Sequence, residues 1–257
     1  MRLLEAKGIT QRFGGLCALE GFCLRVEEGE LVGIIGPNGA GKTTVFNVLT
    51  GFYRPTEGRV ELLGRDVTGE APHRIARAGL ARTFQNIRIF KNLTVLDNVR
   101  NAFSHRLGYA PWEAVVAWPG FRRAEEWCRR EAEVLLERFD LGECRGELPG
   151  DLPYGVQRRV ELARALALRP KVLLLDEPAA GMNPSEVGKL MERIGWIRDE
   201  FGVAIVVIEH QMQLVMGLCE RLVVLDFGKT IAEGLPREIR AHPRVLEAYL
   251  GTSGEQR

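Results

Sequence analysis

The feature that most constrains the fold is a glycine-rich segment between an apolar run and a helix-forming stretch. The segment consists of Gly36, Pro37, Asn38, Gly39, Ala40, Gly41, Lys42, Thr43 and Thr44. It fits the pattern G-x-x-x-x-G-K-[ST], in which glycines allow backbone N–H groups to surround phosphate oxygens. The apolar run 31–35 predicts a buried strand, and residues 44–49 predict the first turns of a helix. This strand–loop–helix order is what a phosphate-binding loop at a helix N-terminus requires.

A second apolar run, 172–175, ends in two adjacent carboxylates, Asp176 and Glu177. Carboxylates at the end of a buried strand beside a phosphate loop are suited to hold Mg²⁺ and to orient an attacking water. We expect Lys42 to reach the β- and γ-phosphates of a nucleoside triphosphate and Thr43 to bind Mg²⁺. Asp176 is expected to hold the same ion, and Glu177 to act as the base that activates water.

Composition excludes several classes of protein. With 257 residues and 46% hydrophobic content, the chain can form one large domain, or a domain with an additional lobe. A net charge of +1 argues against a general nucleic-acid binder. The five cysteines have no C-x-x-C spacing, which argues against a zinc site or a disulfide framework. We find no signal-peptide pattern and no run of about 18 apolar residues, so we expect any membrane spans to come from partners.

Alternation of Val/Ile/Leu runs with helical patterns at both ends predicts an α/β fold with a mostly parallel sheet covered on both faces. We expect a core of residues 1–87 and 166–257, interrupted by a mostly helical insertion at 88–165. Residues 104–120 are predicted to be an irregular insertion whose role is left open. Trp112 and Trp118 are expected to pack within the helical lobe, and a place on the docking surface for a membrane subunit is the alternative. Strands are predicted at 3–6, 22–26, 31–35, 58–63, 80–84, 172–175, 203–208 and 222–225. Helices are predicted at 44–49, 72–77, 95–103, 122–139, 156–168, 185–198 and 211–218, and the tail 228–250 is predicted as a hairpin strand with short helices.

Further motifs occur in a fixed order around the two phosphate motifs. They are Gln85 after the strand 80–84, the segment LPYGVQRRVELARA from Leu152, the segment AGMN at 180–183, and His210 after the strand 203–208. The whole series resembles the ATP-binding subunit of ABC transporters over essentially the full chain. The resemblance implies a P-loop NTPase core with an antiparallel β subdomain and an inserted helical subdomain. It also implies ATP and Mg²⁺ as ligands, and ATP hydrolysis coupled to transport.

Three segments give a closer resemblance. ARTFQNIRIFKNLTVLDNV at 81–99, DEPAAGMNP at 176–184 and IEHQM at 208–212 resemble the ATPases of branched-chain amino-acid importers of the Liv type. The insertion 104–125 is similar to that of the larger of the two Liv-type ATPases. Related importers of urea and other amides share these features, so the transported solute stays open.

Two alternatives from other classes are a soluble ABC ATPase acting on DNA or ribosomes and a regulatory nucleotide-binding module without turnover. The first usually has two cassettes, a long coiled coil or a basic extension, none of which is evident in this sequence. The joint presence of Gln85, Glu177 and His210 argues against the second.

The resemblance also implies roles for single residues. Phe13 stands where the family places an aromatic ring that stacks on adenine, although an ordinary core aromatic is the alternative. Gln85 is similar to the glutamine that touches Mg²⁺ and water and senses the membrane subunits. His210 is similar to the histidine that contacts the γ-phosphate. The catalytic group would thus be Glu177, His210 and Gln85, and the Mg²⁺ ligands Thr43, Gln85 and Asp176.

A loop that acts on the ATP of a second subunit is expected at Tyr154, Gly155 and Gln157. The family sequence Leu-Ser-Gly-Gly-Gln is replaced by LPYGV at 152–156. Pro153 lacks both the serine hydroxyl and a backbone N–H, so we expect weaker contacts across the subunit interface. Asn183 stands where many members have Asp, which removes a charge at that interface.

The resemblance implies an assembly at the membrane. The partners would be two transmembrane permease subunits, a second ATPase subunit and, indirectly, an external solute-binding protein, with no nucleic acid. Both a homodimer and a heterodimer with a shorter sister ATPase are possible, and the Liv-type resemblance favours the heterodimer. The protein would be peripheral, at the cytoplasmic face of the plasma (inner) membrane. Phe90, Leu93 and Val95 are the expected contacts for a short helix of a permease.

Overall fold

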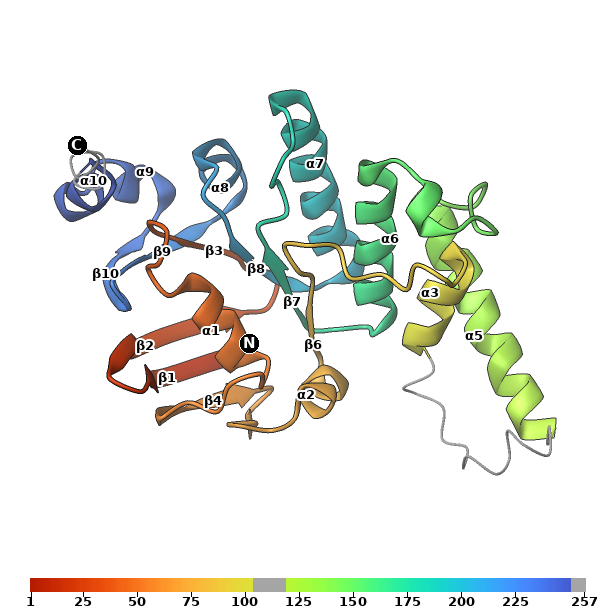
Figure 1. Ribbon diagram of the computed structural model, residues 1–257, viewed down its shortest axis with the longest axis horizontal. Coiled ribbons are helices and arrows are strands. Elements are labelled where there is room, and N and C mark those ends of the chain that lie inside the picture. Colours follow the sequence, from red (N-terminus) through yellow and green to blue (C-terminus); the bar gives the residue numbers. More distant parts are fainter. Residues whose placement is uncertain (104–118, 251–257) are drawn as a thin grey trace. The chain divides into compact units, whose positions relative to one another are not determined.

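The computed structural model describes residues 1–103 and 119–250. The chain forms two compact units, and the colours of Figure 1 follow the sequence from the N-terminus to the C-terminus. The first unit joins Met1–Gln85 with the chain from Lys171 onward, and the second is Asn86–Pro170. The sequence predicted a helical insertion from residue 88 to residue 165, and these limits stay a prediction. Trp112, Trp118 and the rest of 104–118 lie outside the described residues.

An antiparallel sheet forms one part of the first unit. Its strands pair in the order β2-β1-β4-β5 and comprise β1 (Arg2–Phe13), β2 (Leu16–Glu27), β4 (Glu57–Leu62) and β5 (Arg65–Asp66). In the second half of β2, buried residues alternate with exposed ones, so one face of this strand packs against the core. The strands expected at 3–6 and 22–26 are both longer in the structure, because their polar ends continue the ladder.

The second sheet has six strands in the order β10-β9-β3-β8-β7-β6. These are β3 (Leu31–Ile35), β6 (Leu80–Arg82), β7 (Val172–Asp176), β8 (Ala204–Ile208), β9 (Arg221–Asp226) and β10 (Lys229–Gly234). All its pairings are parallel except that of β10 with β9. Every residue of β3, β7 and β8 is buried, as expected for parallel strands covered on both faces. The α/β class with a mostly parallel sheet is therefore confirmed.

Helices of the first unit follow the strands. They are α1 (Lys42–Leu49), α2 (Pro72–Ala78), α7 (Pro184–Phe201), α8 (Met212–Leu218), α9 (Pro236–Arg240) and α10 (Pro243–Leu250). Helix α7 starts with a capping box, in which Asn183 and Glu186 each accept the other's backbone N–H. Helix α1 starts at Lys42, two residues before the predicted start, because the end of the glycine-rich segment already has helical geometry.

The second unit is helical, with α3 (Val95–Phe103), α5 (Pro119–Arg138), a 3₁₀ turn η2 (Pro149–Asp151) and α6 (Tyr154–Ala167). The side chain of Asn98 is buried and exchanges hydrogen bonds with Phe90, donating also to the carbonyls of Leu93 and Thr94. This amide fixes the segment before α3. Among the described residues, no helix is both long and apolar enough to cross a bilayer.

One predicted docking contact is wrong. Val95 is 0% exposed and lies in the core of the second unit, so it is closed to a partner. Phe90 is 49% exposed, and the guanidinium of Arg164 lies 4.6 Å from its ring centroid. Leu93 is partly exposed. The docking role of Phe90 and Leu93 stays a prediction.

Candidate active site

The glycine-rich loop connects β3 to α1 at the carboxyl edge of the parallel sheet. Gly36 and Gly41 have φ angles of 152° and 101°, in a region that side chains disfavour. A Cβ on Gly36 would lie 2.1 Å from the carbonyl oxygen of Leu225, and one on Gly41 would lie 2.7 Å from that of Ala18. Both positions therefore require glycine, because a side chain would disfavour the backbone conformation and would clash with a neighbouring carbonyl group. Glycine allows the loop to pack closely against Leu225 and Ala18.

Lys42 is almost buried at the start of α1. Its Nζ donates to the carbonyl oxygens of Gly36 and Pro37 at 2.7 and 2.8 Å, so the ammonium lies against the loop. Burial lowers the pKa of Lys42, while the charges of Glu177 and Asp176 act in the opposite direction. The loop thus holds a cation where the motif predicts phosphate contact. Thr43, the next residue, is exposed on the first turn of the helix.

Asp176, the last residue of β7, forms a buried ion pair that the sequence did not predict. Its Oδ2 accepts from Arg82 at 2.7 Å, and the side chains are 7% and 5% exposed. The same guanidinium donates to Asn47 of α1 at 2.8 Å and lies over the rings of Phe46 and Phe84. Arg82 therefore connects the carboxylate strand to the helix after the loop. The available signal was an arginine inside the predicted strand 80–84, because a buried charge needs a partner.

Glu177 is the point where separate motifs meet. Its φ of 44° is unusual for a residue other than glycine and is typical of strained functional positions. Its Oε2 accepts a hydrogen bond from Gln85 Nε2 at 2.7 Å, and Nδ1 of His210 lies 3.9 Å from the same oxygen. Two side chains from distant parts of the sequence, those of Gln85 and His210, thus approach one carboxylate oxygen of Glu177.

The remaining predicted nucleotide contact is Phe13, at the end of β1. Its side chain is 42% exposed, and its ring packs edge to face against Tyr53 with centroids 5.1 Å apart. The exposure rules out the alternative that Phe13 is an ordinary core aromatic. Stacking on adenine stays a prediction.

The signature loop lies in the second unit, at the start of α6. Pro153 is the N-cap residue and makes no side-chain capping bond. The N–H groups of Tyr154 and Gly155 belong to the first turn, where a helix offers no internal acceptor. Tyr154 and Gly155 are exposed, whereas Gln157 donates its amide to the carbonyl oxygen of Leu152 at 2.8 Å. Gln157 is thus bonded within its own loop.

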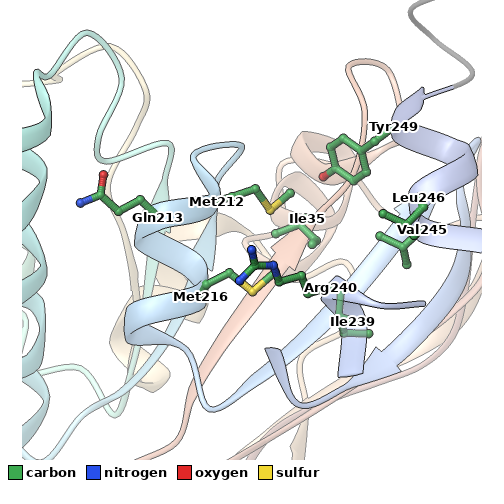
Figure 2. A pocket seen from close by; sticks show the side chains of 9 residues that line it. All are labelled: Ile35, Met212, Gln213, Met216, Ile239, Arg240, Val245, Leu246 and Tyr249. Atoms are coloured by element: carbon green, nitrogen blue, oxygen red, sulfur yellow. The ribbon is translucent and has the colours of Figure 1, made fainter. Parts of the chain in front are cut away.

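A cavity of about 470 Å³ lies between α8 and the C-terminal helices (Figure 2). Its lining is mostly apolar and includes Ile35, the residue before the glycine-rich loop, and Met212 and Met216 of α8. Burial raises the pKa of Tyr249 on α10, and the nearby backbone of Gly36 acts in the opposite direction. The C-terminal helices therefore line this cavity together with Ile35, the residue that precedes the loop.

Oxygen ligands suited to Mg²⁺ are present among the predicted residues. They are the hydroxyl of Thr43, the amide oxygen of Gln85 and the carboxylate of Asp176, and hard oxygen donors are what this ion prefers. Within the described ranges, no group of three or more His, Cys, Asp or Glu side chains is placed to bind a metal. A magnesium site here would thus need oxygens from a bound phosphate group or from water.

Comparisons with known proteins agree with this geometry. Residues 19–180 match the family described as ABC transporter, and residues 229–255 match the one described as branched-chain amino acid ATP-binding cassette transporter. The high-affinity branched-chain amino acid transport ATP-binding protein BraF of Pseudomonas aeruginosa is 47% identical over 97% of this chain and 98% of its own. LivG of Escherichia coli K12, with the same description, is 44% identical over the same shares.

Solved structures show the same fold. The ADP conformation of MJ1267, an ATP-binding cassette of an ABC transporter, superposes with a TM-score of 0.84 at 32% identity, over 98% of this chain and 99% of that one. A nucleotide-free ATP-binding cassette from an ABC transporter has a TM-score of 0.82 at 31% identity, over 97% and 99%. The resemblance deduced from the sequence is confirmed, and the chain belongs to the family of ABC transporter ATP-binding proteins.

Proposed function

We propose that the protein is the Mg²⁺-dependent ATPase subunit of an importer for branched-chain or chemically related amino acids. Family membership implies nucleotide binding and ATPase activity. The observation that supports turnover most directly is the convergence of Gln85 and His210 on the Oε2 atom of Glu177. Relatives 44–47% identical over nearly the whole chain support the amino-acid class of solute.

The chemistry is attack of water on the γ-phosphate of ATP. Lys42 and the N–H groups of the glycine-rich loop bind the phosphates and offset the charge that develops during transfer. Glu177 orients the water and accepts its proton. Gln85 holds the carboxylate of Glu177, and His210 contacts the γ-phosphate, so that the carboxylate and the phosphate are aligned. Mg²⁺, when bound by Thr43, Gln85 and Asp176, would supply further positive charge to the phosphate oxygens.

The composite site requires a second ATPase subunit. The exposed first turn of α6, with the N–H groups of Tyr154 and Gly155, would grip the γ-phosphate of the partner's ATP. ATP binding would close the pair and hydrolysis would open it. Two permease subunits would follow this motion from the cytoplasmic face of the membrane, receiving solute from an external binding protein.

The first experiment is Mg²⁺-dependent ATP hydrolysis across protein concentration for the wild type, Glu177→Gln and Glu28→Gln. Glu28 is an exposed turn residue outside the site, so its variant controls for loss of one carboxylate. We expect a specific rate that rises with concentration, disappears with EDTA or in Glu177→Gln, and is unchanged in Glu28→Gln. Normal turnover in Glu177→Gln would refute the assignment of the base.

The solute is tested by reconstitution of the protein with its permease subunits and binding protein in vesicles. Leucine, isoleucine or valine should stimulate ATP hydrolysis, whereas urea should not. Stimulation by urea alone would replace the amino-acid assignment with an amide importer. Hydrolysis that never responds to the membrane partners would favour an ATPase without a transport role.

A further inference from the structure

Glu209 is a buried carboxylate between β8 and the predicted γ-phosphate contact His210. Its side chain is 0% exposed, yet the family motifs assign it no role. Burial of a carboxylate is costly unless hydrogen bonds replace its contacts with water. The hydrogen bonds that Glu209 accepts therefore indicate which parts of the chain this carboxylate holds together.

Three backbone N–H groups donate to this carboxylate. Oε1 accepts from Ala179 at 2.8 Å, and Oε2 accepts from His210 at 2.9 Å and Gln211 at 3.1 Å. Ala179 follows Glu177 by two residues on the loop after β7. One side chain thus joins the loop after Glu177 to the turn that presents His210.

Gln211 completes the connection from the other side. Its Nε2 donates to the carbonyl oxygen of Ala179 at 2.9 Å, so both backbone groups of Ala179 are bonded to the turn 209–211. Ala179 also accepts from the N–H of Met182, which closes the loop on itself. The loop and the turn are therefore held at a fixed separation.

The imidazole of His210 lies between two carboxylates as a result. Its Nδ1 is 3.9 Å from Oε2 of Glu177 and 3.9 Å from Oε2 of Glu209. The backbone N–H of Glu177 in turn donates to Ile208 at 2.9 Å, so β7 and β8 hold both residues at one edge of the sheet.

We propose that Glu209 and Gln211 are positioning residues that fix His210 relative to Glu177 and to the loop that follows it. The inference rests on the proposed function, because it assigns to these contacts the alignment needed for hydrolysis. Neither side chain touches the reacting atoms in this scheme. Both act through the backbone of Ala179 and the turn that presents His210.

Replacement of Glu209 by Gln is the sharpest test, because it keeps the volume and removes half of the acceptor capacity. The amide NH₂ group must then face either Ala179 or the N–H groups of His210 and Gln211, donor against donor. We expect kcat to fall about tenfold or more, with the KM for ATP changed by less than about twofold, since positioning errors mainly affect the chemical step.

A double-mutant cycle shows whether the effect passes through His210. In the background His210→Ala, Glu209→Gln should lower kcat by less than about twofold, because the group it positions is already gone. Gln211→Met, which keeps length without the donor, should give a smaller loss of kcat than Glu209→Gln. The His210 imidazole signal in NMR spectra, assigned with His210→Asn, should shift in Glu209→Gln.

The matched control is Glu5→Gln, another buried glutamate in the antiparallel sheet, which should leave kcat unchanged. An unchanged kcat in Glu209→Gln, or a loss that adds in full to that of His210→Ala, would overturn the inference while the proposed function stands. Absence of hydrolysis in the wild type, both alone and together with a second ATPase subunit, would instead refute the proposed function. In that case an unshifted His210 signal in Glu209→Gln would refute the positioning role separately.

Discussion

The guanidinium of Arg82 lies 2.7 Å from the carboxylate of Asp176, and both side chains are almost completely buried. The pair joins positions 94 residues apart and fixes one carboxylate of the candidate active site. Its strength depends on the arginine, because the planar guanidinium also donates to Asn47 and Thr50. The site is thus supported by an ion pair that none of its motifs describes.

Removal of Arg82 should destabilise the protein strongly. Arg82→Met leaves Asp176 buried without its cation, and breaking such a pair costs about 3–5 kcal/mol of unfolding free energy. The addition of Asp176→Asn to this variant should recover part of the loss, because the unpaired charge is then gone. Chemical denaturation of the single and double variants measures both effects.

A matched control is available in Arg59, whose ion pair with Glu61 is 3.3 Å long and whose side chain is 59% exposed. Arg59→Met should change the free energy of unfolding by less than about 1 kcal/mol. Equal losses of unfolding free energy in Arg82→Met and Arg59→Met would show that burial does not increase the contribution of the Arg82–Asp176 pair to stability.

The sequence predicted the parts of the site that short motifs encode. The loop before α1 and the carboxylates at the end of β7 lie at the ends of buried strands. Periodicity and spacing were therefore enough to place them at one edge of the sheet. The family resemblance placed Gln85 in the same catalytic group as Glu177, 92 positions away, but it did not predict the hydrogen bond between them. Its geometry needed the structure.

Other features could not be deduced because they depend on distant partners. Arg82 and Glu209 each occur in or next to an apolar strand, where a single sequence shows a charge but not the group that neutralises it. Val95 was wrongly assigned to an exposed surface, because one apolar residue at a helix start fits a core or an interface equally well. The strand 2–13 extends beyond the predicted range 3–6, because backbone pairing continues through polar positions.

Acid stability should depend on Glu5. Hydrogen bonding from Lys7 lowers the pKa of this buried carboxyl from 4.5 to about 2, with Arg2 adding to the effect and burial opposing it. Because the unfolded chain takes up the proton first, the contribution of Glu5 to stability is present above about pH 4.5 and is lost as the pH falls toward 2.

The comparison is thermal unfolding of the wild type and Glu5→Gln at several pH values between 7 and 2. The wild type should be the more stable protein at pH 7, and the difference should shrink steadily below pH 4.5. A difference that stays constant over this range would show that the pKa of Glu5 is not lowered in the folded protein.

Thiol reactivity should separate two cysteines of the first unit. Burial raises the pKa of Cys219 to about 12, and its Sγ lies so close to β3 that a Cβ on Gly33 would approach it to 3.0 Å. Cys23 is exposed on β2. At pH 8, iodoacetamide should therefore label Cys23 in the native protein and Cys219 only after denaturation, as measured by peptide mass spectrometry. Labelling of both at the same rate in the native state would contradict the packing of Cys219 against β3.

The last prediction concerns Pro153, which begins α6 without a capping side chain. In Pro153→Ser, the hydroxyl could cap the helix or donate to the γ-phosphate of the partner's ATP, and the backbone would regain an N–H. A hydrogen bond to a charged group contributes about 1.5–3 kcal/mol, so ATP-dependent pairing should tighten by about tenfold or more. The measurement is analytical ultracentrifugation with ATP of Glu177→Gln, in which hydrolysis does not intervene, against the double variant Glu177→Gln/Pro153→Ser.

Lys91→Ser is a suitable control for this change, since Lys91 is exposed in the second unit outside the signature loop. It should leave pairing unchanged in the same background. If Pro153→Ser also leaves pairing unchanged, then the N–H groups of Tyr154 and Gly155 already saturate the γ-phosphate, and the proline costs the interface nothing. If pairing tightens, the departure from the family motif is a device that keeps two copies of this chain apart, which would favour assembly with a different sister ATPase.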